Sequence, residues 1–333
     1  MKIAVLGSGA WGTALAMLLL ENGHDVTLWS FSEEDRRKME ATRRNEKLPD
    51  ILLPEGLKIS SDLSVVRGCG LVVLVTPSFA VRETAAKLAS LIEPDAIIVS
   101  ASKGIEKGTS LRLSEVIRSE VGPRIPVAVL SGPSHAEEVA ARIPTGVVAA
   151  AEDPDIACRV QRLFMNERFR VYTSGDKIGT ELCAALKNVI ALCAGWCDGM
   201  GLGDNTKALL MTRGLAEMAR LGVALGGRKD TFAGLAGVGD LIVTCTSMHS
   251  RNRRCGILIG QGKSVGEAIR GVGAVVEGYY AAANARALAE KTGVEMPITE
   301  AAYQVLYEGR DPRSVISALM GRDGRSEQDE SWV

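Results

Sequence analysis

Residues 3–12 read IAVLGSGAWG, a short apolar run that leads into three glycines with the spacing G-x-G-x-x-G. An apolar helical stretch, residues 13–21, follows directly, so the glycines lie between a predicted strand and a predicted helix. In that setting Gly7 permits a tight turn, Gly9 lets the backbone approach a pyrophosphate, and Gly12 lets the helix pack on the strand. We therefore predict a dinucleotide site at the helix N-terminus, with a purely structural glycine turn as the alternative.

Strand-like and helical stretches alternate through the first half of the chain. The predicted strands are residues 3–6, 26–29, 71–75, 96–99, 127–130, 146–150 and 169–172. The predicted helices after the first are residues 33–47, 80–92, 110–120 and 155–166. Apolar strands separated by helices indicate a parallel sheet that helices cover on both faces. We expect an α/β, Rossmann-type dinucleotide-binding domain over residues 1–176.

The second half lacks strand-like runs and is rich in Ala and Leu. Helices are predicted at residues 178–197, 207–221, 276–292, 299–307 and 312–320, with glycine-rich loops between them. This pattern indicates an all-α domain over residues 177–320, with a core of small side chains at close helix crossings. Residues 321–333 are polar, and we expect a disordered tail.

Composition excludes several classes of protein. Of 333 residues, 46% are hydrophobic, and 39 Lys and Arg nearly balance 40 Asp and Glu, which argues against a nucleic-acid or membrane-surface binder. The seven cysteines are scattered, as is typical of reduced thiols in a cytoplasmic protein. Cys193 and Cys197 are one helical turn apart, but ordinary packing explains them better than a metal site, and we predict no metal. No apolar stretch approaches transmembrane length, and no targeting signal is visible.

The choice between NAD and NADP stays open in the sequence. The second predicted strand ends at Ser30-Phe31-Ser32, where a carboxylate would favour NAD and an arginine NADP. Arg36 and Arg37 come only on the next helix, where solvated surface is an equal alternative. Trp11, inside the glycine loop, packs either over the cofactor or into the space below it.

Three segments could supply proton-transfer chemistry to a nicotinamide enzyme. Lys103 follows a predicted strand, where open α/β sheets place ligands. Lys187 lies within an apolar helix, where burial would lower its pKa toward a useful acid–base range, unless it is a surface lysine that reaches solvent. Asp240, in the glycine-rich stretch at residues 237–240, could pair with such a lysine.

Residues 250–254, SRNRR, form the densest basic run of the second half. Arginine offers a bidentate fork to a phosphate, and serine and asparagine add neutral donors. A solvated loop and a nucleic-acid contact are the alternatives, and the lack of interleaved aromatic residues makes the latter the weakest.

Several longer motifs together resemble the bacterial type of NAD(P)-dependent glycerol-3-phosphate dehydrogenase. The resemblance runs from residue 1 to about 320, and its motifs keep the family's order. They are GSGAWGTA at 7–14, SKG at 102–104, SGPS at 131–134, ELCAALKNVI at 181–190, GDNT at 203–206, TRGLAEM at 212–218, GLAGVGDL at 234–241 and SRN at 250–252.

The resemblance implies reversible reduction of dihydroxyacetone phosphate to sn-glycerol 3-phosphate, which feeds phospholipid synthesis, with NAD or NADP as cofactor. It implies a C-terminal domain similar to that of 6-phosphogluconate dehydrogenase. Lys187 would be the general acid/base, and the substrate would contact Lys103, Gly132, Ser134, Lys187, Asp240, Ser250, Arg251 and Asn252. The cofactor would contact Gly7, Gly9, Ala10, Trp11, Gly12, Phe31, Lys103, Ala136, Arg251, Val275 and Glu277. A homodimer is also implied.

Two departures from the family pattern concern the cofactor. Ala10 stands where the family often has Ser, and Phe31 and Ser32 stand where it often has a basic or imidazole side chain. His135 has no catalytic role in this family, so packing or surface exposure is expected. The alternatives to this enzyme are a two-domain dehydrogenase of β-hydroxy acids and a regulator that binds NAD(H) without turnover.

Overall fold

The glycine stretch turns the chain from β1 (Lys2–Leu6) into α1 (Ala10–Glu21) in the computed structural model, which describes residues 1–324, 326 and 327. Gly7 has a φ of +124°, and a Cβ there would lie 2.7 Å from the carbonyl oxygen of Val75. A Cβ on Gly12 would lie 1.9 Å from the carbonyl oxygen of Gly7. Both positions therefore need glycine, one for the turn and one for the contact of helix with loop.

The main sheet has eight strands in the order β10-β9-β8-β7-β6-β1-β2-β5. After β1 they are β2 (Asp25–Trp29), β5 (Lys58–Ser60), β6 (Leu71–Leu74), β7 (Ile97–Ser100), β8 (Val127–Ser131), β9 (Thr145–Ala150) and β10 (Phe169–Ser174). From β1, the sheet grows to one side through β2 and β5 and to the other side through β6 to β10. The strand order therefore reverses at β1, and a doubly wound sheet binds its ligand at such a point. The predicted Rossmann-type fold is confirmed.

The sheet departs from the all-parallel prediction at one pair, because β8 and β9 are antiparallel. Their connection holds only the five-residue helix α5 (Ala136–Ala140), which packs on α1, whereas longer helices join the parallel neighbours.

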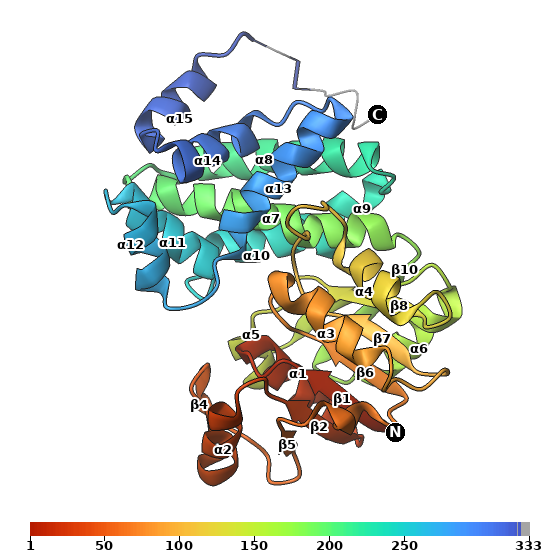
Figure 1. Ribbon diagram of the computed structural model, residues 1–333. Coiled ribbons are helices and arrows are strands. Elements are labelled where there is room, and N and C mark those ends of the chain that lie inside the picture. Colours follow the sequence, from red (N-terminus) through yellow and green to blue (C-terminus); the bar gives the residue numbers. More distant parts are fainter. Residues whose placement is uncertain (325, 328–333) are drawn as a thin grey trace. The chain divides into compact units, whose positions relative to one another are not determined.

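Helices cover both faces of the sheet, as expected (Figure 1). They are α2 (Glu33–Thr42), α3 (Val81–Leu88), α4 (Leu113–Val121) and α6 (Pro154–Phe164), together with α1 and α5. Alternate strand residues such as Val5, Val73 and Val99 form one core with α1, α5 and α6. All four residues of β6 are fully buried, because helices lie on both sides of it.

The helix predicted at residues 33–47 is wrong over its last five residues. Helix α2 ends at Thr42, and Arg43 takes a left-handed φ of 51° before a hairpin of β3 (Arg44–Asn45) and β4 (Leu48–Leu52). The Arg43 guanidinium donates to the carbonyl oxygens of Pro54 and Leu57, which stabilises this turn. A charged stretch with no apolar period carries no signal for such a turn.

The helical half is built around α7 (Lys177–Gly199). The other helices are α8 (Asp204–Ala224), α9 (Lys229–Ala233), α10 (Asp240–Thr246), α11 (Arg251–Gly260), α12 (Val265–Val272), α13 (Glu277–Thr292), α14 (Pro297–Glu308) and α15 (Pro312–Met320). Four of these, α9 to α12, fall in stretches predicted as loops. Helix α7 is long and apolar enough to cross a membrane, contrary to the prediction, but it is almost wholly buried as a core helix.

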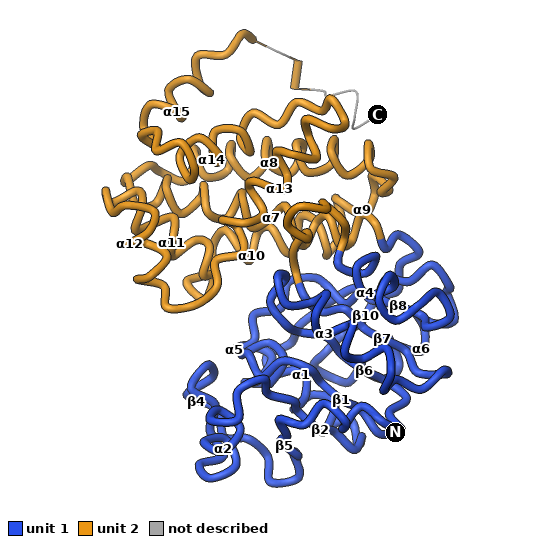
Figure 2. The backbone as a smooth tube through the Cα atoms, in the orientation of Figure 1, with its two compact units in different colours: residues 1–102, 113–177 blue, residues 103–112, 178–333 orange. Residues whose placement is uncertain are grey.

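Two compact units divide the chain (Figure 2). The sheet unit comprises Met1–Ser102 and Leu113–Lys177, and the helical unit comprises Lys103–Arg112 and Ile178–Val333. A single boundary at residue 176 therefore misses residues 103–112. These belong to the helical unit because Ile105 accepts a 2.8 Å hydrogen bond from buried Asn284 on α13, and Arg112 pairs with Glu181 on α7. The tail predicted to be disordered, residues 321–333, follows α15, and its residues 325 and 328–333 lie outside the described residues.

Candidate functional site

Lys187 lies on α7 with only 4% of its surface exposed. Its ammonium donates to Asp240 Oδ1 at 2.5 Å and to Thr244 Oγ1 at 2.7 Å, both on α10. The Thr244 hydroxyl donates in turn to the backbone carbonyl of Asp240. A lysine this deep in a core is tolerated because two oxygens replace its lost hydration. The alternative of a surface lysine is therefore wrong.

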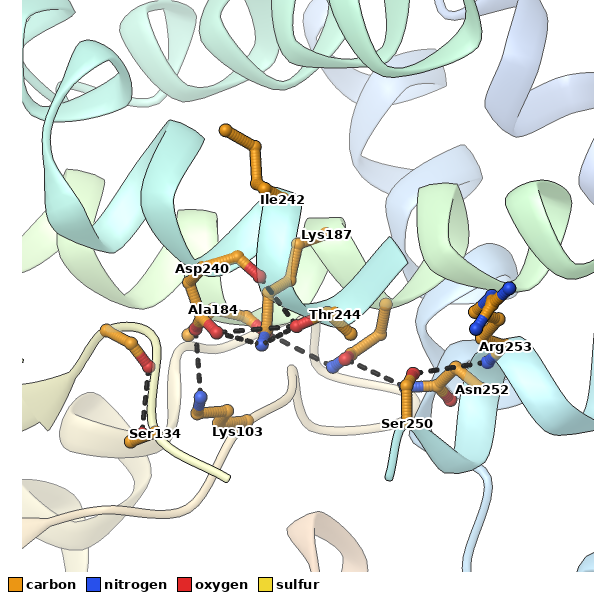
Figure 3. A network of polar contacts seen from close by, with 12 residues as sticks. Lys103, Ser134, Ala184, Lys187, Asp240, Ile242, Thr244, Ser250, Asn252 and Arg253 are labelled. Atoms are coloured by element: carbon orange, nitrogen blue, oxygen red, sulfur yellow. Dashed lines mark hydrogen bonds and ion pairs between the residues drawn. The ribbon is translucent and has the colours of Figure 1, made fainter. Parts of the chain in front are cut away.

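Asp240 joins two lysines (Figure 3). Its Oδ1 accepts from Lys187, and its Oδ2 accepts from Lys103 Nζ at 2.8 Å. The carboxylate is 1% exposed, and it begins α10 directly after the π-helical turn Leu235–Gly239. The predicted glycine-rich turn is thus helical, and it delivers the carboxylate to Lys187. One buried carboxylate and two ammonium groups leave a local net charge of +1, which suits an anionic ligand.

Burial and charge set the protonation of this cluster. Burial lowers the pKa of Lys187 to about 7, assisted by repulsion from Lys103 and opposed by attraction to Asp240. Burial alone would raise the pKa of Asp240, but the attraction of Lys103 and Lys187 outweighs it and keeps that pKa below its usual value. At neutral pH Asp240 is therefore ionised, and Lys187 is poised to give or take a proton.

A second polar chain joins three helices beside Lys187. Asn252 on α11 donates to Asn188 Oδ1 on α7 at 2.9 Å, and its own Oδ1 accepts from the backbone N–H of Gly278 on α13 at 2.9 Å. Gly278 belongs to the first turn of α13, so this bond also positions Val275 and Glu277, which precede it. Asn252 therefore has a structural contact as well as its predicted substrate role.

The basic run at residues 250–254 is not a loop. Ser250 caps α11 by accepting a hydrogen bond from the backbone N–H of Arg253. The Arg253 guanidinium donates to Asp198 on α7 at 2.7 Å and to the carbonyl of Thr246, so it holds α11 in place. Arg251, the first residue of α11, is exposed. An exposed arginine at a helix N-terminus, where the helix dipole favours negative charge, is well suited to a phosphate.

The glycine loop of the sheet unit fits a dinucleotide. Gly9 is the N-cap of α1, and a Cβ built on it meets nothing within 4 Å. Packing within the protein therefore does not explain this glycine, whereas close approach of a pyrophosphate does. Trp11 packs against the core beneath, and its buried ring N–H has no hydrogen-bond partner among the described residues. Ala10 starts α1, so its backbone N–H is one of the donors that a helix leaves for an anion.

Asn45 is a supporting residue that sequence reasoning missed. It is buried, and its amide donates to the carbonyl of Ser8 at 3.0 Å and to Thr13 Oγ1 at 2.7 Å. It therefore ties the hairpin to the glycine loop and to the first turn of α1. Only the unforeseen turn at Arg43 brings it there.

Phe31 follows β2 and is 80% exposed. Its ring meets Trp29 edge to face, with 6.3 Å between centroids. Beneath it, Ser30 accepts from Ser8 Oγ at 2.8 Å, which links the end of β2 to the glycine loop. This bond between Ser8 and Ser30 brings the glycine loop next to Phe31, so the cofactor residues predicted in the loop lie near Phe31.

Gly132, Ser134 and Ala136 lie where β8 leads into α5. Gly132 has a φ of +143°, and Ser134 Oγ donates to its carbonyl oxygen at 2.8 Å. Ala136 begins α5, and His135 is its N-cap position, without a side-chain capping bond.

No group of three or more His, Cys, Asp or Glu that could hold a metal ion occurs among residues 1–324, 326 and 327. The cysteines, Cys193 and Cys197 included, are free thiols.

Comparison with known proteins identifies a family. Residues 2–157 match the N-terminus, and residues 176–317 the C-terminus, of NAD-dependent glycerol-3-phosphate dehydrogenase. The chain is 54% identical over 323 residues to a glycerol-3-phosphate dehydrogenase [NAD(P)+] of Moorella thermoacetica, covering 96% of each protein. It is 50% identical over 330 residues to the enzyme of the same name from Desulfitobacterium hafniense, covering 99% of this chain and 94% of that one.

Solved structures agree with the sequence matches. The glycerol-3-phosphate dehydrogenase of Coxiella burnetii superposes with a TM-score of 0.93 at 42% identity, over 96% of this chain and 98% of that chain. A D-mandelate dehydrogenase superposes with a TM-score of 0.61 at 16% identity, over 95% of this chain and 100% of that chain, which shows a shared fold only. With both halves of the chain matched in order, the protein is a member of the NAD-dependent glycerol-3-phosphate dehydrogenase family of oxidoreductases.

Proposed function

We propose that the protein reduces dihydroxyacetone phosphate reversibly to sn-glycerol 3-phosphate with NADH or NADPH, and that Lys187 is the general acid/base. The observation that carries this proposal is the buried cluster of Lys187, Asp240 and Lys103. Burial of the two charges of Lys187 and Asp240, with half-buried Lys103 beside them, is costly, and a fold that needed only a stable core would fill this space with apolar groups. A regulator that binds coenzyme without turnover would have no use for the cluster.

Lys187 supplies the proton from Nζ. An ammonium carries three N–H donors, and two of them bond to Asp240 and Thr244, which leaves the third for the C2 oxygen of the ketone. The reduced nicotinamide, when bound, supplies the hydride to C2. With a pKa of about 7, Lys187 is protonated often enough to donate during reduction and neutral often enough to accept during oxidation.

Asp240 and Lys103 prepare this transfer. The carboxylate orients Nζ of Lys187 and stabilises its charged form through the ion pair. Lys103, bonded to the other oxygen of Asp240, adds a positive charge toward the anionic substrate. The two lysines also repel each other, which keeps the proton on Lys187 transferable.

The N-terminus of α11 is the proposed phosphate site. Ser250 shapes the cap, Arg251 supplies a guanidinium, and the first backbone N–H groups of the helix favour an anion. Asn252 holds this turn against α7 through Asn188. Gly132 and Ser134 are also proposed to contact the substrate.

The remaining predicted residues are proposed to bind the coenzyme. The glycine loop with Ala10 and Trp11 would take the pyrophosphate, and Phe31 would offer its exposed ring to the adenine. Ala136, Val275, Glu277, Lys103 and Arg251 are the other proposed coenzyme contacts. We further propose a homodimer that works in the cytoplasm, supplies phospholipid synthesis and binds neither nucleic acid nor membrane.

The test compares dihydroxyacetone phosphate with unphosphorylated dihydroxyacetone, following oxidation of the reduced coenzyme. We expect kcat/KM to be at least about a hundredfold lower without the phosphate, because the cationic site then loses its partner. Arg251→Ala should raise KM for the phosphorylated ketone about tenfold, the value of one charge-assisted hydrogen bond. Arg254→Ala, an exposed arginine of the same helix, is the control. Equal rates with the two ketones would contradict the proposal.

A further inference from the structure

The end of β2 bears on which coenzyme this chain prefers. In dinucleotide folds a carboxylate about twenty residues after the glycine loop binds the adenosine ribose of NAD, whereas an arginine nearby accommodates the 2′-phosphate of NADP. Ser30, where the acid is expected, is buried and bonded to Ser8 and to the carbonyl of Ser32. The first carboxylate is Glu33, at the start of α2.

Glu33 pairs with both Arg36 and Arg37, the two arginines that could bind a 2′-phosphate. Its two carboxylate oxygens accept from Nε and Nη2 of Arg36, each at 2.7 Å, in a bidentate pair. Arg37 Nε also donates to Glu33, at 2.9 Å. The other terminal nitrogen of Arg36 bonds to Glu40. The guanidinium groups are thus held by carboxylates of their own helix.

Glu33 is itself fixed in place. Ser61, which follows β5, donates its hydroxyl to the carboxylate, and the backbone carbonyl of Ser61 accepts from the ring N–H of Trp29 at 3.0 Å. Hydrogen bonds from Arg36 and Ser61 hold the pKa of Glu33 far below its usual range, so it remains charged at any working pH.

The charge of this segment disfavours another anion. Glu33, Glu34 and Asp35 form the first turn of α2, directly after Phe31 and Ser32. A 2′-phosphate adds a charge of about −1.5 to −2. To bind it, Arg36 would have to leave a bidentate carboxylate, and three other carboxylates on the same helix would repel the phosphate.

We infer that the chain prefers NADH to NADPH, and that Glu33 sets this preference by holding Arg36 and Arg37 and by opposing a 2′-phosphate. The inference rests on the proposed function in taking the coenzyme to be a nicotinamide dinucleotide at the glycine loop. Arg36 and Arg37 are then surface ion-pair partners, not phosphate ligands. The charges of α2 decide between the two coenzymes, because the exposed ring of Phe31 offers the same surface to either of them.

The experiment titrates the purified protein, without ketone, with NADH and with NADPH, and follows nicotinamide fluorescence. We expect NADH to bind at least about tenfold more tightly, which is about 1.4 kcal/mol. In Glu33→Gln, Arg36 and Arg37 lose their shared partner, so the affinity for NADPH should rise. The ratio of the two dissociation constants should then become at least about threefold smaller. The rise in Tm with each coenzyme gives the same ratio by an independent route.

Glu34→Gln is the matched control, because it removes the same charge one residue further on but takes a partner only from Lys38, which keeps Glu46. It should leave the ratio almost unchanged. Tighter or equal binding of NADPH by the unaltered protein would overturn the inference. So would a ratio of dissociation constants that does not change in Glu33→Gln, or that changes as much in Glu34→Gln. A protein that prefers NADH but does not turn over dihydroxyacetone phosphate would contradict only the proposed function. Turnover with a preference for NADPH would contradict only this inference.

Discussion

Asp240 shares its two oxygens between Lys103 and Lys187, and this sharing governs the proton on Lys187. With Lys187 as the proposed proton donor, reduction requires the charged ammonium, so the rate of reduction should fall as pH rises through about 7, while the rate of oxidation should rise. In Asp240→Asn the attraction that favours the ammonium is lost. The pKa of Lys187 should then fall further, and the alkaline limb of the reduction profile should move down by at least about one pH unit.

The measurement for Asp240→Asn is kcat/KM for the ketone from pH 5 to 9. Because the substrate's phosphate titrates near pH 6, the informative quantity is the shift between variant and unaltered protein. Asp230→Asn is the control, since that carboxylate lies on the surface and pairs with Arg228. An unmoved limb would show that Asp240 does not set the proton affinity of Lys187.

At the scale of residues, sequence reasoning named the three members of the cluster, but only as separate segments. A lysine in an apolar helix and an aspartate after glycines were visible because charge is unexpected in such places. Thr244 was not, because its contact with Lys187 depends on α10, which forms where a glycine-rich loop was predicted. Asn45 was hidden in the same way by the hairpin that replaces a predicted helix.

Among the elements, α14 is anchored to α8 by a buried carboxylate. Glu217 on α8 accepts from the backbone N–H groups of Ile298 at 2.7 Å and Thr299 at 3.2 Å, in the first turn of α14. Burial raises the pKa of Glu217 to about 7, although these N–H groups oppose the rise. Because the folded pKa lies above the unfolded value of 4.5, the folded state binds a proton more tightly.

The stability contributed by that proton is fully present below pH 4.5 and is lost as pH rises to about 7. Glu217→Gln removes this dependence. As pH rises from 4.5 to about 7, the unaltered protein should lose on the order of 3 kcal/mol in free energy of unfolding relative to the variant. Urea unfolding at several pH values measures it, with exposed Glu308→Gln as the control. A difference independent of pH would refute the assignment.

The crossing of α7 and α11 requires glycine. A Cβ on Gly256 would lie 2.0 Å from the carbonyl oxygen of Leu192, and one on Gly195 would lie 2.1 Å from that of Arg253. Alanine is the better helix former by about 1 kcal/mol, so Gly256→Ala would stabilise a helix that had no such contact. Here it should destabilise the protein by about 2 to 3 kcal/mol.

Urea unfolding of Gly256→Ala tests that sign. Gly175→Ala is the control, because a Cβ at Gly175 meets nothing within 4 Å. Gain of stability at position 256 would mean that the helices can separate without cost.

Helices with an apolar period and strands with apolar runs were predictable, and their main members are where the sequence analysis expects them. Short helices after glycines, such as α9 and α10, were not, because glycine is a poor helix former and tertiary contacts decide its conformation. The antiparallel β8–β9 pair has no local signal either, since strand direction depends on the path of the connection.

For the whole molecule, each of the two units carries a different part of the proposed machinery. The sheet unit has the open glycine loop, and the helical unit has the buried lysine cluster. The chain passes from one to the other after Ser102, so the residues that follow β7 carry Lys103 to the helical unit. A prediction of domains by composition alone assigns such a short segment to the wrong unit, because its membership depends on long-range contacts with Asn284 and Glu181.

The proposed reaction depends on proton transfer by Lys187, and Lys187→Met tests this role most directly. Methionine keeps the unbranched apolar stem of the side chain as far as Cε but lacks the ammonium group, so it carries no transferable proton. The measurement is kcat for reduction of dihydroxyacetone phosphate, together with the Kd for the reduced coenzyme. We predict that kcat falls by at least about a hundredfold while the Kd is unchanged. A kcat within about tenfold of the unaltered protein would contradict the account, because the proton would then come from another group.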